Sequence, residues 1–176
     1  MDTLASFHPK VVHFAIALLL TYVLFEFLYL IFKKDFLNKS ATLILFLGVL
    51  GALASLLTGN QAYHYAEYLF DNYDVKIPLG AIDHHEEYAT WTLFWFLGIL
   101  IIRFLLNLKD KFRGFLQAVV FTLSLVGVYL VYETGEHGGE LVYKYGVGTK
   151  VIEKGIVPDS ISTPSQNGDN EEEHEH

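Results

Sequence analysis

The sequence predicts an all-α protein, an integral membrane four-helix bundle followed by a disordered acidic C-terminal tail. Apolar residues make up 52% of the 176 residues and aromatic residues 15%, whereas charged residues make up only 18%. The charges gather between four long apolar runs. Each run is close to the ~20 residues with which a helix crosses ~30 Å of hydrocarbon. Composition and charge placement together therefore indicate four membrane spans.

The expected spans follow one another at about residues 11–32, 41–62, 88–108 and 115–132. The first follows MDTLASFHPK, where an acidic residue precedes any basic one and no small-residue cleavage pattern follows the apolar run. We therefore expect a permanent span and not a cleaved signal peptide. Residues 1–153 form the transmembrane domain in this interpretation. Residues 154–176 are polar and acidic without an apolar period, which predicts a disordered tail.

Basic residues predict the orientation of the spans. The connections after the first and third spans, together with the inner end of the third span, carry Lys33, Lys34, Lys39, Arg103, Lys109, Lys111 and Arg113. Such an excess next to membrane ends is typical of the cytoplasmic side. We therefore expect a multi-pass protein of the bacterial inner (cytoplasmic) membrane with both termini on the outer side. The connection at about 63–83 then also lies outside.

The composition excludes several functions. Because the sequence has no cysteine, it can hold neither an iron–sulfur cluster on thiolates nor a covalently attached c-type haem. The formal net charge is -8, much of it from the terminal segment GDNEEEHEH, and we expect no nucleic-acid partner. No feature demands catalysis, so an electron carrier is expected in preference to an enzyme.

Histidines provide the main functional signal. Six of them fall on the expected outer side, at His8, His13, His64, His84, His85 and His137. The inner halves of the spans and the cytoplasmic connections contain none. A structural role at an aromatic membrane interface is the alternative for any one of them. The asymmetry of the set favours a shared site.

Helical geometry narrows the set. Neighbouring residues of a helix point about 100° apart, so His84 and His85 cannot both face the interior. Proline favours the first helical position, so Pro9 places His8 at the cap. His13 lies about 7.5 Å further along the axis, at 1.5 Å per residue. We therefore expect His13 to be the buried histidine of the first span.

The chain also looks like a doubled hairpin. The first and third spans each have a histidine followed four residues later by alanine, at His13 and Ala17 and at His85 and Ala89. The second and fourth spans each end in Thr-Gly before a histidine, at Thr58, Gly59 and His64 and at Thr134, Gly135 and His137. Such a repeat would set His13 opposite His85. The two alanines would then leave space for a flat ligand below the histidines.

Two opposed neutral imidazoles are the ligand set of a low-spin b-type haem, which carries electrons. Phe14, Trp91 and Trp95 are expected to bury its ring. The alternative is copper, zinc or iron held by side chains drawn from His8, His13, His64, His85, His137 and Glu133. His64 with Glu67 and Glu133 with His137 do not match the Glu-x-x-His pattern of di-iron carboxylate proteins, which argues against a di-iron site.

Two features predict helix packing. Glu26 lies in the inner third of the first span, where an unpaired charge is costly, so we expect a structural ion pair with Arg103. A proton relay is the alternative. A stripe of small residues in the second span, at Gly51, Ser55 and Gly59, favours close packing of helices. Space for a macrocycle is the second interpretation of that stripe.

The segments HPKVVHFAIALLL and TGEHGGELVYKYGVGT resemble a family of bacterial four-helix membrane proteins known as a domain of unknown function. Its members look as if they begin with His-Pro-x-x-Val-His-Phe and close with Gly-Gly-x-Leu-Val-Tyr-x-x-Gly-Val-Gly. The resemblance covers about residues 7–149. It matches His8, Pro9, Val12, His13, Phe14, His84 or His85, Gly138, Gly139, Leu141, Val142, Tyr143, Gly146, Val147 and Gly148.

This family is thought to be related to di-haem b-type cytochromes, which implies membrane electron transfer. Tyr145 stands where relatives often have histidine, and the inner side has no histidine, so we expect one haem near the outer face. Its partners would be the lipid bilayer and a redox protein or larger membrane complex. The alternative is a non-redox membrane protein, either a metal-binding protein or a structural subunit.

The closing segment has its own prediction. Gly138 and Gly139 are expected to stop the fourth helix, and the residues after them to form a strand-like or interfacial stretch over the outer mouth of the bundle. In the tail, His174 and His176 are candidates for weak metal binding, although a solvated tail is the simpler interpretation.

Overall fold

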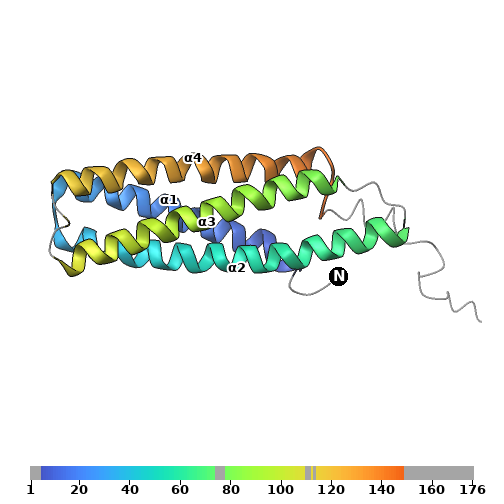
Figure 1. Ribbon diagram of the computed structural model, residues 1–176, viewed down its shortest axis with the longest axis horizontal. Helices are drawn as coiled ribbons and strands as arrows, with labels where there is room; N and C mark the ends of the chain where they lie inside the picture. The colour runs from blue at the N-terminus through green and yellow to red at the C-terminus, as the bar shows by residue number, and fades with distance from the viewer. Residues whose placement is uncertain (1–4, 74–77, 110–111, 113, 149–176) are drawn as a thin grey trace, which may run out of the picture.

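The computed structural model describes residues 5–73, 78–109, 112 and 114–148. A 3₁₀ turn (Ala5–Phe7) leads into four long helices that run up and down the bundle (Figure 1). They are α1 (His8–Phe32), α2 (Asp35–Tyr73), α3 (Leu79–Leu108) and α4 (Phe115–Tyr143). No strand occurs among the described residues. The prediction of an all-α four-helix protein is confirmed.

The helix boundaries agree with the prediction at three positions, where α1 ends at 32, α3 ends at 108 and α4 starts at 115. At the same end of the bundle, α2 starts at Asp35, six residues before the expected start at about 41. The expected connection at 63–83 is wrong, because α2 continues to Tyr73 and α3 begins at Leu79. The expected helix stop at Gly138 and Gly139 is also wrong, because α4 continues through both glycines. The predicted domain boundary after 153, the tail and its two histidines lie outside the described residues.

The four helices form a ring of neighbours. α1 packs most extensively on α2, and α3 on α4, so the chain consists of two helical hairpins. Smaller contacts of α2 with α3 and of α1 with α4 close the ring, which leaves α1 and α3 diagonally opposite. We call the end with the α1–α2 and α3–α4 connections the basic end, after its Lys33, Lys34, Lys39 and Lys109. The opposite end is the histidine end.

The basic end is closed by aromatic packing. Lys33 ends α1 with a left-handed backbone (φ 52°), and its N–H donates to the Tyr29 carbonyl oxygen at 2.9 Å. The buried Phe112 stacks on Tyr29 with ring centroids 5.8 Å apart. Gly114, which also has a positive φ (58°), immediately precedes the first residue of α4. This packing fixes the two hairpins beside each other.

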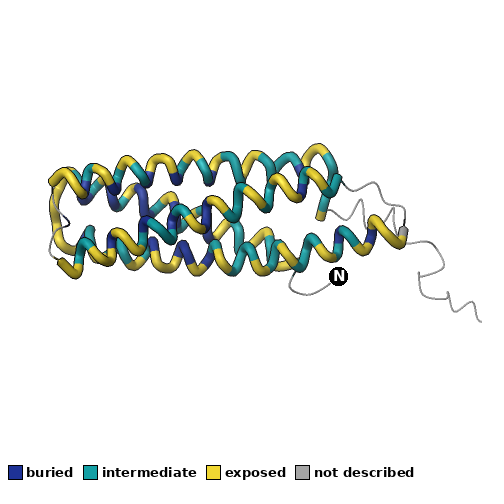
Figure 2. The backbone as a smooth tube through the Cα atoms, viewed as in Figure 1, coloured by how far each residue is buried: buried dark blue, intermediate teal, exposed yellow. Residues whose placement is uncertain are grey.

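The middle of the bundle is a tightly packed apolar layer. Leu19 of α1 lies against Gly48, and Phe96 of α3 lies against Gly127. A Cβ atom at these glycines would come within 2.8 Å and 2.5 Å of the two side chains, so a larger residue would force Leu19 or Phe96 to shift. Figure 2 shows the buried positions on the inward sides of the helices. The layer separates the two ends of the bundle.

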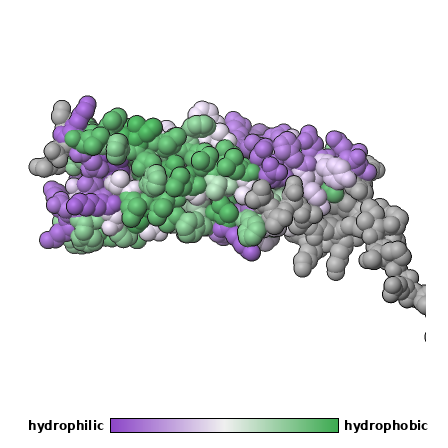
Figure 3. Space-filling model, turned by 90° about the horizontal axis from the view of Figure 1, so that it is seen from below, coloured by the Kyte–Doolittle hydropathy of each residue, from purple (hydrophilic) through white to green (hydrophobic). Residues whose placement is uncertain are grey.

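The outward surface is apolar. Each helix is long and apolar enough to cross a membrane, judged by length and composition. Many large apolar side chains are exposed, among them Leu24, Leu43, Leu57, Phe94, Phe104 and Tyr129. Figure 3 shows a hydrophobic band over the middle of the molecule and hydrophilic residues at both ends. A helical bundle with this surface satisfies its backbone polar groups internally, as hydrocarbon requires.

Candidate functional site

Two histidines from diagonally opposite helices meet inside the histidine end. His8 is the first residue of α1, and His85 lies in the second turn of α3. Their ring centroids are 6.5 Å apart, and the ring planes are inclined at 80°. Both side chains are partly buried. The fold therefore places one imidazole from each hairpin near the axis of the bundle.

His8 is held by the second helix of its own hairpin. Its Nδ1 lies 3.1 Å from the Thr58 hydroxyl oxygen. That hydroxyl lies 2.9 Å from the Ala54 carbonyl oxygen, to which it donates. Because the single hydroxyl hydrogen is used in this way, Thr58 accepts from His8, and Nδ1 carries the ring hydrogen. The imidazole edge rests on Gly59, where a Cβ atom would lie 3.0 Å from the ring.

His85 is held in the same manner by α4. Its Nδ1 lies 3.0 Å from the Thr134 carbonyl oxygen. A carbonyl oxygen only accepts, so Nδ1 again carries the hydrogen. Gly138 forms the surface under this ring, since a Cβ atom there would lie 2.9 Å from the imidazole. In the neutral forms, both rings therefore keep the Nε2 lone pair available.

A third histidine lies beside the pair. His137 of α4 is partly buried and stacks on Tyr88 of α3, with ring centroids 4.6 Å apart and planes 22° apart. Its Nδ1 donates to the Glu133 carbonyl oxygen, one turn earlier in the same helix, at 2.8 Å. The flat contact with Tyr88 fixes its orientation. His137 thus borders the His8–His85 pair as part of the helix packing.

The other predicted histidines do not join this site. His13, His64 and His84 are exposed. His13 donates from Nδ1 to the Pro9 carbonyl oxygen of its own helix at 2.6 Å, and His64 lies 3.4 Å from the Glu67 carboxylate. The expectation that His13 is buried opposite His85 is therefore wrong. His13 follows His8 by five positions, which turns the two side chains about 140° apart around α1.

The residues expected to enclose a ligand near His13 also point elsewhere. Ala17, one turn below His13, is exposed, whereas Ala89, one turn below His85, is partly buried. Phe14 and Trp91 are exposed, contrary to the expectation that they line the interior. Trp95 is partly buried and donates its indole N–H to the Leu123 carbonyl oxygen at 2.9 Å.

In the described part of the chain, the carboxylate side chains do not combine with the histidines to form a metal site. Glu133 is partly buried, and its backbone carbonyl is the group bonded to His137. Within the described residues, no group of three or more histidine, aspartate or glutamate side chains has the arrangement of a metal site. The arrangement that remains is the two-imidazole pair.

The small-residue stripe on α2 serves α1 packing, as expected. Gly51 lies against Ala15, where a Cβ atom would approach to 3.3 Å, and Gly59 lies against His8. The Ser55 hydroxyl donates to the Gly51 carbonyl oxygen at 2.9 Å. The stripe thus brings α1 close enough to α2 for the His8 ring to rest on the α2 backbone.

The predicted ion pair at the opposite end is also present. Glu26 and Arg103 face each other with both side chains fully buried. Arg103 donates from Nε to the Thr42 hydroxyl oxygen at 3.1 Å and from a terminal nitrogen to the Asn38 carbonyl oxygen at 2.9 Å. Its guanidinium lies over Phe112, 4.5 Å from the ring centroid. These contacts give the buried charge polar and aromatic partners.

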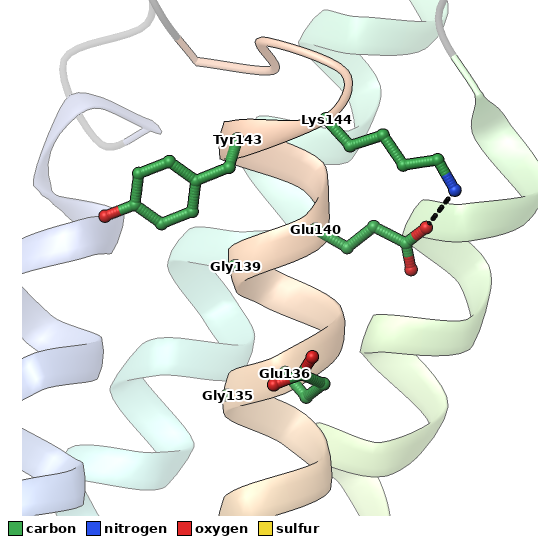
Figure 4. A pocket seen from close by; sticks show the side chains of 6 residues that line it. All are labelled: Gly135, Glu136, Gly139, Glu140, Tyr143 and Lys144. Atoms are coloured by element: carbon green, nitrogen blue, oxygen red, sulfur yellow. Dashed lines mark hydrogen bonds and ion pairs between the residues drawn. The ribbon is translucent and has the colours of Figure 1, made fainter.

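An open hollow of about 470 Å³ lies on α4 near the histidine end. Figure 4 shows that its lining comes from the end of α4 and from Lys144, the residue that follows it, with the Lys144 side chain reaching Glu140. The Lys144 ammonium lies 2.5 Å from the Glu140 carboxylate, and this hydrogen bond raises the pKa of Lys144. Neither His85 nor His137 lines the hollow, so it is separate from the histidine pair.

His8 was expected only at the helix cap, and the contacts of Thr58, Thr134 and Gly138 with the two rings were not predicted. The spacing of residues along the chain could have indicated that His8 faces the interior. His8 precedes Glu26 by 18 residues, and His85 precedes Arg103 by 18 residues. Eighteen residues are five full turns at 3.6 residues per turn, so each histidine shares the face of its helix with the buried charge.

The chain matches one family model, described as "Predicted membrane protein (DUF2231)", over residues 5–151. No curated protein and no solved structure matches it. The match covers all four helices and the histidine pair. It agrees with the four candidate membrane spans and with the apolar outer surface. The chain therefore belongs to the DUF2231 family of membrane proteins.

Proposed function

We propose that this protein is a membrane electron-transfer protein that binds a b-type haem through His8 and His85. The observation that carries this proposal is the facing pair of imidazoles from two different hairpins, with ring centroids 6.5 Å apart. Bis-histidine ligation of this kind leaves no open position on the iron and suits electron transfer. The proposal takes its cofactor from the sequence prediction and replaces His13 by His8.

The donor chemistry of the pair fits the cofactor. The His8 Nδ1 lies 3.1 Å from the Thr58 hydroxyl oxygen, and the His85 Nδ1 lies 3.0 Å from the Thr134 carbonyl oxygen. Metal-ligating histidines commonly donate their second ring N–H in this way, which fixes the tautomer and raises the basicity of the ligating nitrogen.

When bound, a b-type haem supplies one-electron chemistry. The residues of this chain would hold and orient it. Thr58 and the Thr134 carbonyl keep both rings in the tautomer that presents Nε2. Because His8 and His85 belong to different hairpins, ligation of both would also tie the two hairpins together.

The position of the pair indicates where electrons would enter and leave. The fully buried Leu19 and Phe96 form an apolar layer between the histidines and the Glu26–Arg103 pair. The two polar pairs are about 27 Å apart along the helices, at 1.5 Å per residue. We therefore propose that a redox partner docks at the histidine end. By the distribution of lysines, this end would face the outer side of the inner membrane.

A copper ion is the second candidate for this site. The close packing of the two rings on Gly59 and Gly138 favours it, because a single ion needs less space than a macrocycle. Imidazole is a suitable ligand for copper as well as for iron. The same two histidines would serve in either case.

The visible spectrum of the purified full-length protein, before and after reduction with dithionite, tests the proposal. The protein would be produced in cells supplied with a haem precursor and with copper, and its metal content would be measured alongside. Sharp α and β bands with stoichiometric iron support the haem. Stoichiometric copper without these bands supports the second candidate. A colourless, metal-free protein would contradict both and leave the histidines a packing role.

A further inference from the structure

A groove between α2 and α3 at the basic end has the polarity of a lipid molecule. Its volume is about 770 Å³. The polar lining residues, Asn38, Lys39, Thr42 and Asn107, are those nearest the connections of the bundle. From Asn38 the groove extends eight residues along α2 to Phe46, about 12 Å at 1.5 Å per residue. Every lining residue beyond the polar group is apolar.

The hydrogen bonds within the groove determine what the polar end can bind. Asn38 donates its side-chain amide to the Asn107 side-chain oxygen at 2.9 Å and accepts from Arg103 at 2.5 Å. The Thr42 hydroxyl donates to the Asn38 carbonyl oxygen at 3.0 Å and accepts from Arg103 at 3.1 Å. The acceptors Asn107 Oδ1 and Asn38 Oδ1 and the Thr42 hydroxyl are therefore already engaged.

The groups left at the polar end are hydrogen-bond donors. They are the Lys39 ammonium and the Asn107 side-chain nitrogen, for which the described part of the chain provides no acceptor. No carboxylate lines the groove. Lys109 adds positive charge at the same end of the bundle. A ligand head that accepts hydrogen bonds and carries negative charge complements these groups.

We propose that this groove binds an anionic phospholipid from the leaflet at the basic end. Its phosphate would contact Lys39 and Asn107, and an acyl chain would lie along the apolar walls that include Phe46 and Phe104. The polar end of the groove lies towards the end of the bundle and the apolar part towards its middle, which is the orientation of a lipid in that leaflet. The site is independent of any metal at the histidine end.

Lipid binding to the full-length protein can be measured by native mass spectrometry from detergent, with phosphatidylglycerol and phosphatidylcholine offered at equal concentration. We expect one phosphatidylglycerol to remain bound in preference to phosphatidylcholine. Lys39→Gln should reduce its affinity about fivefold, since a lysine near an anionic lipid contributes on the order of that factor. Lys34→Gln is the matched control, because Lys34 is exposed at the same end and does not line the groove.

The shape of the groove is tested separately. Leu43→Trp enlarges a lining side chain and should lower phosphatidylglycerol binding, whereas Leu47→Trp changes an exposed residue of the same helix outside the groove and should not. Three results would overturn the proposal: equal retention of both lipids, equal losses in Lys39→Gln and Lys34→Gln, or unchanged binding in Leu43→Trp. Circular dichroism of each variant confirms that a loss of binding does not reflect unfolding.

Discussion

Glu26 of α1 and Arg103 of α3 form an ion pair with no exposed surface, five helical turns from the histidine pair on the same two helices. His8 and His85 are 77 positions apart, as are Glu26 and Arg103. The two hairpins therefore present equivalent positions to each other at both ends of the bundle. Because eighteen residues are five full helical turns, the two imidazoles lie on the same inward faces of α1 and α3 as the ion pair.

Removing one member of the ion pair should be more damaging than removing both. Arg103→Leu leaves the Glu26 carboxylate buried without a counter-charge, which costs about 3–5 kcal/mol. Glu26→Leu combined with Arg103→Leu leaves no buried charge and should recover most of that loss. Unfolding of the purified proteins in mixed micelles measures the difference. A double variant whose loss equals the sum of the two single losses would show that the ion pair is not the cause.

The two glycines beneath the imidazoles should not tolerate a methyl group. Gly59→Ala and Gly138→Ala bring a Cβ atom to 3.0 Å and 2.9 Å from a histidine ring. Overpacking of this kind costs about 1–3 kcal/mol. Gly98→Ala is the matched control, since nothing lies within 4 Å of its Cβ position, and it should stabilise the helix by up to about 1 kcal/mol. Equal effects of all three substitutions on thermal unfolding would contradict this account.

The hydrogen bonds to the two histidines predict an asymmetric response to loss of a threonine hydroxyl. Thr58→Val removes the hydroxyl partner of His8 Nδ1 and leaves that ring the Ser55 backbone, whereas Thr134→Val preserves the carbonyl that accepts from His85. Loss of such a partner typically weakens metal binding about 10–100-fold. We therefore expect weaker cofactor binding in Thr58→Val, with a much smaller effect in Thr134→Val. A titration of haem or copper into the cofactor-free proteins measures both affinities, and equal weakening would disprove the assignment.

The fold could be predicted from hydropathy because each span must be long and apolar. At the basic end, charged residues next to the apolar runs mark the boundaries of α1, α3 and α4, whereas α2 begins at Asp35, six residues before the expected start at about 41. At the histidine end, α2 and α4 continue through polar and aromatic residues beyond the apolar runs, so hydropathy underestimated their length. Gly138 was interpreted as a helix stop, although it lies within α4 where His85 approaches the backbone.

The site was harder to predict because it depends on rotation about the helix axis. Because proline favours the first helical position, Pro9 predicts that His8 lies at the cap and that His13 is the histidine inside the helix. The buried Glu26 provides a better reference, since counting back five full turns along α1 leads to His8. Counting back from Arg103 along α3 leads in the same way to His85 and not to His84. The roles of Thr58 and Thr134 follow from contacts between helices, which spacing along the chain does not show.

The central claim is that His8, and not His13, pairs with His85 to hold the cofactor. The most direct test compares the reduced visible spectrum and metal content of His8→Ala, His13→Ala and His85→Ala with those of the unmodified protein, with circular dichroism as the check on folding. We predict that His8→Ala and His85→Ala lose the bound cofactor while His13→Ala, a change at an exposed position, retains it. Loss in His13→Ala with retention in His8→Ala would contradict the account.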